Sequence, residues 1–144
     1  MTLTPAPLWK RILAAVYDGL AVIGLLMGVF VVIFVTAILI LGKYAVIEEH
    51  VLWGSWIVRS IMLLSVFIYF HLSWRNGGQT LGMKSWHLYV IRPDKQPITL
   101  WQSALRFISG LLVIGWLWCL VDPQKRALQD IVSNTRLLQK APSN

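Results

Sequence analysis

The chain has 144 residues, of which 57% are hydrophobic and 13% are charged, and its net charge is +7. Because an ordinary soluble protein has about a quarter of its residues charged, this composition excludes that class and indicates a membrane protein. The length allows one compact unit, so we treat residues 1–144 as a single membrane domain with a core at about residues 9–138.

The first apolar stretch predicts a membrane-spanning helix at about residues 12–42. From Gly19 to Gly42 no residue is charged. This part alone would be about 36 Å long as a helix, whereas the hydrocarbon core of a bilayer measures roughly 30 Å. The stretch is too long for the apolar part of a secretory signal and lacks a small-residue cleavage site behind it, so we expect a retained helix.

Two charged residues stand at the beginning of this helix, Arg11 and Asp18. Their spacing of seven residues places them on one helix face, but about 10 Å apart along the axis. A charged side chain within a span is expected to face protein or water and to meet an opposite charge. Asp18 is therefore the first functional candidate of the chain.

A second apolar stretch predicts another span at about residues 51–74. The connection between the spans carries Glu48 and Glu49 against a single Lys43, whereas the flanks of the pair carry mostly Lys and Arg. The positive-inside rule then places the amino terminus and the connection 75–98 in the cytoplasm. The Glu48 region is expected on the outside.

The cytoplasmic connection contains the segment Gly78-Gln79-Thr80-Leu81-Gly82, in which two glycines flank small polar residues. Such a segment suits a tight turn where a helix leaves the bilayer. Its backbone amides also suit an anion or a lipid phosphate, although a plain turn is the favoured interpretation. Residues 86–91 are β-prone and residues 92–97 supply turn chemistry, which together predict a small cytoplasmic β-hairpin.

A third, shorter apolar stretch covers about residues 99–121. Thr99 and Gln102 match a capping box and mark the start of its helix. Two alternatives are open: the helix crosses the bilayer with Arg106 reaching toward the interface, or it bends at Gly110 or Gly115 and returns as a re-entrant segment. The basic tail favours the return, because a crossing would carry its charges outward.

The tail, residues 122–144, begins with Asp122-Pro123, which is typical of a helix start. The sequence therefore predicts a short amphipathic helix from Gln124 to Ile131. Its basic face suits the headgroups of anionic lipids. Six residues are candidates for anion or lipid-head contact: Gly78, Gln79, Thr80, Lys84, Lys125 and Arg126.

The predicted fold is thus an all-α membrane protein with two full transmembrane helices, a third short apolar helix that spans or is re-entrant, a cytoplasmic β-hairpin and an amphipathic tail helix. The residues resemble the RDD family of bacterial membrane proteins, named for one arginine and two aspartates. The resemblance rests on these residues, in this order: Arg11, Asp18, Gly78 to Gly82, Arg106, Arg126 to Asp130, and Thr135.

The resemblance implies a multi-pass protein of the bacterial inner membrane and carries the family's charged residues to Arg11, Asp18 and Asp130. It implies transport of an unidentified ligand, with sodium/proton exchange linked to some members. The family commonly has a histidine where this chain has Gln129. Since glutamine does not titrate, a proton relay through that position is not expected here.

We expect Arg11, Asp18, Arg106 and Asp130 to form one polar cluster near the cytoplasmic side, with Arg106 as the better partner for Asp18. The favoured interpretation is a structural clamp, and the alternative is an ion or proton site. The protein is accordingly a small transporter or ion exchanger, or an accessory protein that stabilises membrane partners.

Other classes have less support in the sequence. Nucleophile, phosphate-loop, HExxH and CxxC motifs are missing from it, so we expect no enzyme, no cofactor and no metal site. The basic residues flank the apolar stretches, where orientation and lipid explain them before nucleic acid does. Gly24 and Gly28 give the first helix a small-residue face suited to a homo-oligomer.

Overall fold

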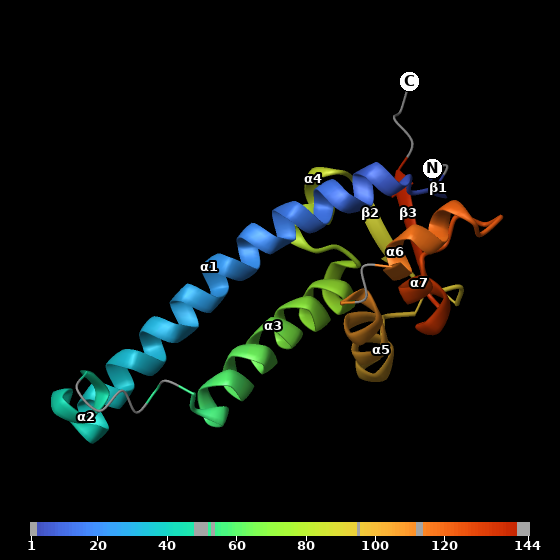
Figure 1. Cartoon of the computed structure of the whole chain (residues 1–144). Coiled ribbons are helices and arrows are strands. Elements are labelled where there is room, and N and C mark those ends of the chain that lie inside the picture. Colours follow the sequence, from blue (N-terminus) through green and yellow to red (C-terminus); the bar gives the residue numbers. More distant parts are fainter. Residues whose placement is uncertain (1–2, 48–51, 53, 95, 112–113, 141–144) are drawn as a thin grey trace. The chain divides into compact units, whose positions relative to one another are not determined.

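The computed structural model describes residues 3–47, 52, 54–94, 96–111 and 114–140. Figure 1 shows its elements in chain order: β1 (Leu3–Pro5), α1 (Leu8–Leu41), α2 (Lys43–Ile47), α3 (Trp56–Gly77), α4 (Leu81–Ser85), β2 (Leu88–Ile91), α5 (Leu100–Gly110), α6 (Ile114–Leu117), the 3-10 helix η1 (Trp118–Leu120), α7 (Leu128–Val132) and β3 (Arg136–Lys140). The chain divides into two compact units, which are described separately: residues 1–19 with 69–144, and residues 20–68.

Two of the described helices, α1 and α3, are long and apolar enough to cross a membrane. With 34 and 22 residues they measure about 51 and 33 Å, both above the roughly 30 Å of a bilayer core. This confirms the prediction of two candidate spans. Compared with the predicted ranges, α1 begins earlier, at Leu8, and α3 is shifted to 56–77. The predicted outer residues Glu48 and Glu49 lie outside the described residues.

The unit of residues 20–68 contains the apolar length of α1, the short α2 and the first part of α3. Most of its large apolar side chains are exposed, Leu39 and Ile40 among the most exposed of them. Gly42, at φ +87°, ends α1 in a conformation that glycine adopts without a steric penalty. Apolar side chains dominate this surface, as a lipid environment requires, although Arg59 of α3 is also exposed.

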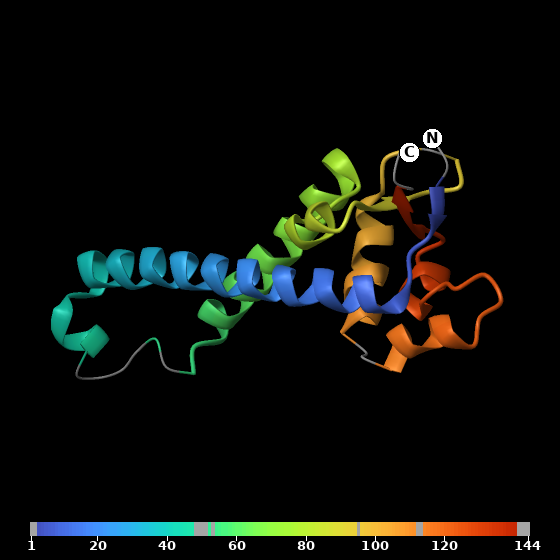
Figure 2. The same cartoon turned by 90° about the horizontal axis from the view of Figure 1, so that it is seen from above.

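The other unit is built on a small antiparallel sheet in the order β1-β3-β2. Figure 2 shows β1 beside β3, and the register pairs Thr4 with Gln139. On the other edge of β3, Tyr89 of β2 pairs with Leu138. The predicted hairpin within residues 86–98 is therefore wrong, because β2 takes its partner from the far end of the chain instead of from the next residues.

A small apolar core lies against this sheet. It combines side chains from the strands with others from the first turns of α1 and the end of α3: Ala6, Ala14, Trp74, Met83, Leu88, Val90, Ile98 and Leu137. Phe107 of α5 packs against it. The core therefore connects the first turns of α1 and the last turns of α3 to the strand β3.

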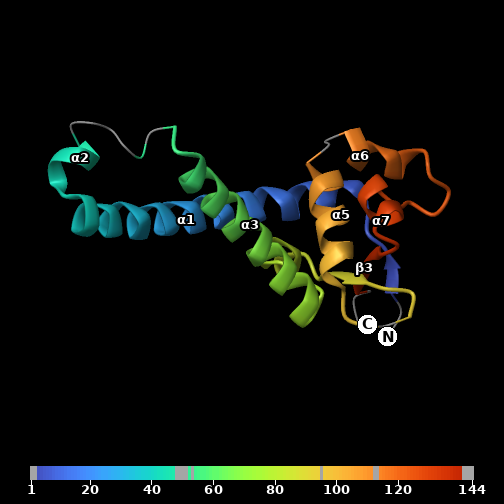
Figure 3. The same ribbon diagram turned by 90° about the horizontal axis from the view of Figure 1, so that it is seen from below.

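The third apolar stretch forms three short helical elements in the described residues, α5, α6 and η1. The Thr99 hydroxyl accepts from the Gln102 backbone and the Gln102 side chain accepts from Thr99, which is the predicted capping box. Helix α5 ends at Gly110, after 11 residues, and α6 begins at Ile114. The described residues of 99–121 are therefore not one continuous helix. Figure 3 shows α5 beside α7.

The tail helix is also shorter than predicted, since α7 covers only Leu128–Val132 instead of 124–131. Asp122 does not cap a helix: its carboxylate accepts from the backbone and guanidinium of Arg126 and holds a turn. Lys125 has φ +54°, which interrupts any helix there. The local signals at Asp122-Pro123 thus produce a turn, and the helix starts one turn later.

Candidate functional site

Asp130 is the centre of a buried charged group with two arginines. One carboxylate oxygen lies 2.6 Å from Arg11 Nη1, and the other lies 2.7 Å from Arg106 Nη1. All three side chains are almost wholly buried. We call Arg11, Arg106 and Asp130 the Arg–Asp triad. It joins the first turns of α1, the middle of α5 and the start of α7, three elements far apart in sequence.

Each of the three side-chain nitrogens of Arg11 donates a hydrogen bond. Its Nε donates to the Ala6 carbonyl and its Nη2 to the Lys125 carbonyl, both at 3.1 Å, while Nη1 faces Asp130. Ala6 follows β1, and its backbone N–H continues the sheet by donating to Leu137. The rigid fork of an arginine is suited to such a three-way contact. Arg11 therefore ties the end of β1 to the tail.

Arg106 projects from α5 toward the tail. Besides Asp130, its Nη1 reaches the Thr135 hydroxyl at 2.8 Å. Within the described part of the chain its Nε and Nη2 have no hydrogen-bond acceptor. The guanidinium carbon instead lies 5.3 Å from the centroid of the Trp74 ring, a distance at which the aromatic face attracts a cation.

Asp130 is kept ionised by its neighbours. Burial opposes its charge, but the guanidinium groups of Arg106 and Arg11 outweigh that effect and lower the pKa of the Asp130 carboxyl below its ordinary value. The same carboxylate accepts from the Ala127 backbone, and the Asp130 carbonyl accepts from Thr135 N. One side chain thus fixes the helix start of α7 and two cations.

Asp18 does not join the triad. Its carboxylate accepts from the Thr80 hydroxyl at 2.5 Å, from the Gly82 backbone at 2.8 Å and from the Tyr69 hydroxyl at 3.4 Å. The expectation that Asp18 meets Arg106 or Arg11 is wrong in the described residues. Both arginines reach toward Asp130 instead, and the one helix that carries Arg11 and Asp18 separates them by about 10 Å.

The segment 78–82 is a connector that this carboxylate holds in place. Gly78, at φ +65°, lies so close to β2 that a Cβ there would stand 2.8 Å from the Val90 carbonyl oxygen. The Gln79 amide donates to the Leu88 carbonyl, and Thr80 caps α4. A Cβ at Gly82 would overlap the carbonyl oxygen of Ala14. The Gly82 backbone N–H and the Thr80 hydroxyl of this segment do bind an anion, and that anion is the Asp18 carboxylate of the same chain.

A family model described as the RDD family matches residues 5–134, which is most of the chain. The protein belongs to the RDD family. Neither the comparison with curated proteins nor the comparison with solved structures gave a match. The three residues carried over from the family's pattern divide in this RDD protein: Arg11 and Asp130 form an ion pair, and Asp18 binds neutral donors.

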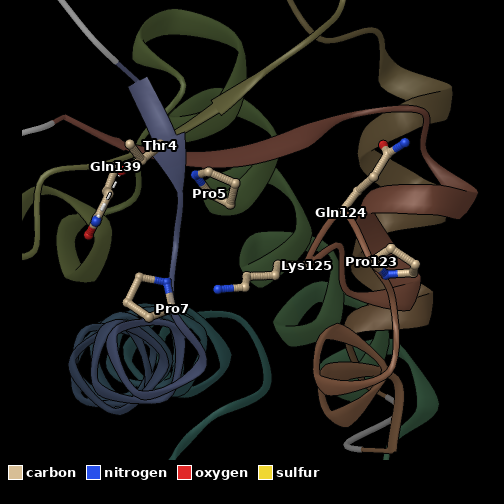
Figure 4. Close-up of a pocket in the computed structure, with 7 residues that line it drawn as sticks. All are labelled: Thr4, Pro5, Pro7, Pro123, Gln124, Lys125 and Gln139. Atoms are coloured by element: carbon tan, nitrogen blue, oxygen red, sulfur yellow. Dashed lines mark hydrogen bonds between the residues drawn. The ribbon is translucent and has the colours of Figure 1, made fainter.

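The remaining predicted anion contacts of this RDD protein lie at the surface. Lys84 and Lys125 are exposed, and Arg126 is paired with Asp122 at 3.0 Å. Hydrogen bonds between these two raise the pKa of Arg126 and lower the pKa of Asp122. Figure 4 shows a shallow pocket beside them, in which the Lys125 side chain extends toward Pro7. The pocket is lined by Thr4, Pro5, Pro7, Pro123, Gln124, Lys125 and Gln139.

Sequence reasoning missed two contributors to these sites. Tyr69 lies next to Asp18, and Trp74 lies under Arg106, yet both stand at the end of an apolar stretch where aromatic residues are common in any membrane protein. No local signal separates them from an interfacial belt. Among the described residues, no group of three or more His, Cys, Asp or Glu side chains is arranged to hold a metal ion.

Proposed function

We propose that this RDD protein is a structural or accessory component of the bacterial inner membrane, in which the Arg–Asp triad clamps the carboxyl-terminal elements onto the ends of the two spans. The observation that carries the proposal is the double pairing of Asp130 with Arg11 and Arg106. Buried charges that satisfy each other in one geometry specify how elements dock, and their loss leaves an uncompensated charge.

Reconstitution tests this role directly. The purified protein is placed in liposomes, and sodium and proton fluxes are compared with those of empty liposomes and of the Asp18→Asn variant. A structural role predicts no flux above the empty control and copurification of a defined membrane partner. Ion-dependent proton movement that disappears in a folded Asp18→Asn variant would overturn it.

The second candidate function is ion or proton exchange at Asp18. Its support is the nature of the contacts: the carboxylate is buried, and its hydrogen-bond donors are a hydroxyl, a phenol and a backbone amide, all neutral. A buried carboxylate in a membrane helix that is held by neutral donors is a chemically reasonable place for a proton or a small cation. The flux assay above separates this candidate from the clamp.

We place the amino terminus, the connection 75–98 and the tail on the cytoplasmic side. The distribution of Lys and Arg supports this orientation. The sheet β1-β3-β2 supports a common side for all three segments, because hydrogen-bonded strands cannot be divided by a bilayer. In a Cys119→Ala background, Gln96→Cys and Gln124→Cys should react with a membrane-impermeant maleimide from the cytoplasmic side, and Tyr44→Cys from the opposite side.

The exposed cations Lys84 and Lys125, with the pocket of Figure 4, support contact with anionic lipid heads at this surface. Flotation with vesicles of neutral or anionic lipid tests that contact by comparing the wild type with Lys125→Glu, which reverses an exposed charge. A homo-oligomer through Gly24 and Gly28 is supported by the open space around both residues. Crosslinking of Gly28→Cys in the membrane tests it.

A further inference from the structure

Helix α5 has a polar buried face and a largely apolar exposed face. The side chains that it buries are polar, namely Ser103, Arg106 and Ser109. Phe107 packs against the core, but other apolar side chains point outward: Trp101 is 72% exposed, Ile108 64%, and Leu111, which follows the helix, 66%. In water, a helix is expected to bury its apolar face and expose its polar face, which is the opposite arrangement. The arrangement is stable only where the surroundings are apolar and the protein interior supplies the polar partners.

The interior does supply those partners. Ser103 Oγ lies 2.9 Å from His71 Nδ1, Arg106 meets Asp130 of the Arg–Asp triad, and the Ser109 hydroxyl donates to the Leu105 carbonyl at 2.6 Å. Each of the three buried polar side chains thus has at least one hydrogen bond within the protein, and the Arg106 guanidinium also lies over the Trp74 ring. What the outer face lacks is an apolar partner, and the described residues of its own unit leave that face open.

The last turns of α3 show at what depth α5 lies. Phe70 contacts Phe107 at 5.9 Å between ring centroids, and His71 contacts Ser103. Arg106 also lies over the Trp74 ring, so three residues of α5 contact the last two turns of α3. Because Phe70 lies seven residues before the end of α3 at Gly77, Phe107 reaches about 10 Å below the level of that end.

The length of α5 agrees with that depth. Its 11 residues measure about 16 Å, half of a roughly 30 Å hydrocarbon core. It ends at Gly110, and the elements that follow, α6 and η1, carry the exposed apolar residues Leu117, Leu120 and Val121 before Asp122. The tail then returns to the sheet through β3, which pairs with both β1 and β2.

We propose that α5 with α6 and η1 forms a re-entrant hairpin that enters the cytoplasmic half of the bilayer, reaches about mid-depth near Leu111, and returns to the same side. Lipid acyl chains cover its outer face. The proposal rests on the proposed membrane function for the presence of a bilayer. The juxtaposition that carries it is a short, polar-inside helix packed along the end of a spanning helix, with both of its ends anchored at one sheet.

Depth-dependent quenching tests the hairpin. Single cysteines replace Trp101, Leu111 and Gln124 in a Cys119→Ala background, each carries an environment-sensitive fluorophore, and the protein is reconstituted with phosphatidylcholine brominated either near the headgroup or near the methyl end of the chain. We expect the label at position 111 to lose most fluorescence with methyl-end bromine and the label at 101 with headgroup-end bromine. The label at 124 should be quenched by aqueous iodide.

A control position separates this inference from the membrane assignment itself. Val31→Cys lies in the middle of the long apolar part of α1 and should be quenched by methyl-end bromine. If position 31 is quenched but 111 and 101 respond only to iodide, the hairpin is overturned while the membrane protein stands. If position 31 also responds only to iodide, the membrane assignment fails. Reaction of Gln124→Cys from the side opposite to Gln96→Cys would show a full crossing and overturn the return.

Discussion

Arg11 and Asp130 stand 119 positions apart in the chain and form a buried ion pair of 2.6 Å. The pair brings the first turns of a membrane helix and a short helix of the tail to one point. Arg106 approaches the same carboxylate from the other side, so a single negative charge serves two cations. Loss of the Asp130 charge therefore affects both arginines at once.

Removal of the Asp130 charge should destabilise the protein strongly. In Asp130→Asn the two buried guanidinium groups lose their counter-charge, and breaking a buried pair in this way typically costs about 3–5 kcal/mol. Thermal unfolding of the purified protein in detergent measures the effect. The control is Asp94→Asn, which removes the exposed partner of Arg92 and should change stability by about 1 kcal/mol or less. Equal midpoints for the two variants would contradict the clamp.

The contribution of Asp130 should disappear in acid. Because the two arginines lower the pKa of this carboxyl in the folded protein, its ionised form stabilises the fold at every pH above the ordinary carboxyl value of about 4. As pH falls through the folded-state pKa, that stabilisation is lost. We therefore expect the difference in unfolding midpoint between wild type and Asp130→Asn to be constant from neutral pH down to about 5 and to shrink below about 4. If the difference in unfolding midpoint grew in acid, the predicted direction of its pH dependence would be wrong.

Gly82 should tolerate no side chain. A Cβ at this position overlaps the Ala14 carbonyl oxygen, so Gly82→Ala has to push α4 away from α1, and overpacking of this kind costs about 1–3 kcal/mol. Gly19→Ala, in α1, is the matched control, because a Cβ there meets nothing within 4 Å and alanine favours a helix by about 0.5–1 kcal/mol. The two variants should move the unfolding midpoint in opposite directions.

The hydroxyl of Thr80 should matter more than its shape. It donates to Asp18 and accepts from Met83 N, so Thr80→Val, which has nearly the same volume, leaves a buried carboxylate short of a donor at a cost of about 1–3 kcal/mol. Thr80→Ser retains the hydroxyl and should recover most of the loss. Limited proteolysis within the connection 75–98 reports the same docking, and equal cleavage of the two variants would argue against the hydrogen bond.

Local signals in the sequence predicted local structure well. The capping box of Thr99 and Gln102 is present because both of its hydrogen bonds close within one helical turn. The two apolar helices follow from length and composition alone. At Asp122 the signal was equally local but ambiguous, since a carboxylate that can cap a helix can also accept hydrogen bonds within a turn. Here the Arg126 backbone donates to the carboxylate, and a turn forms.

Contacts between distant segments were not predictable in the same way. The β-prone residues 88–91 were recognised, but their partner strand lies at 136–140 and carries no pattern that points to them. Of the four charged residues expected together, three meet. Asp18 is excluded because one rigid helix holds it and Arg11 at different heights, while the segment 78–82 offers neutral donors at the height of Asp18. A spacing argument alone does not rank these partners.

The position of β3 in the sheet sets an order of assembly. β3 is the middle strand, and both β1 and β2 pair only with it in the described sheet, yet ribosomes make it after the other two. Until residues 136–140 have left the ribosome, the edges of β1 and β2 have no partner strand, although α1 and α3 are already available for insertion. A chain stopped before Arg136 therefore leaves both strand edges unpaired and exposes them to the quality-control proteases of the cell.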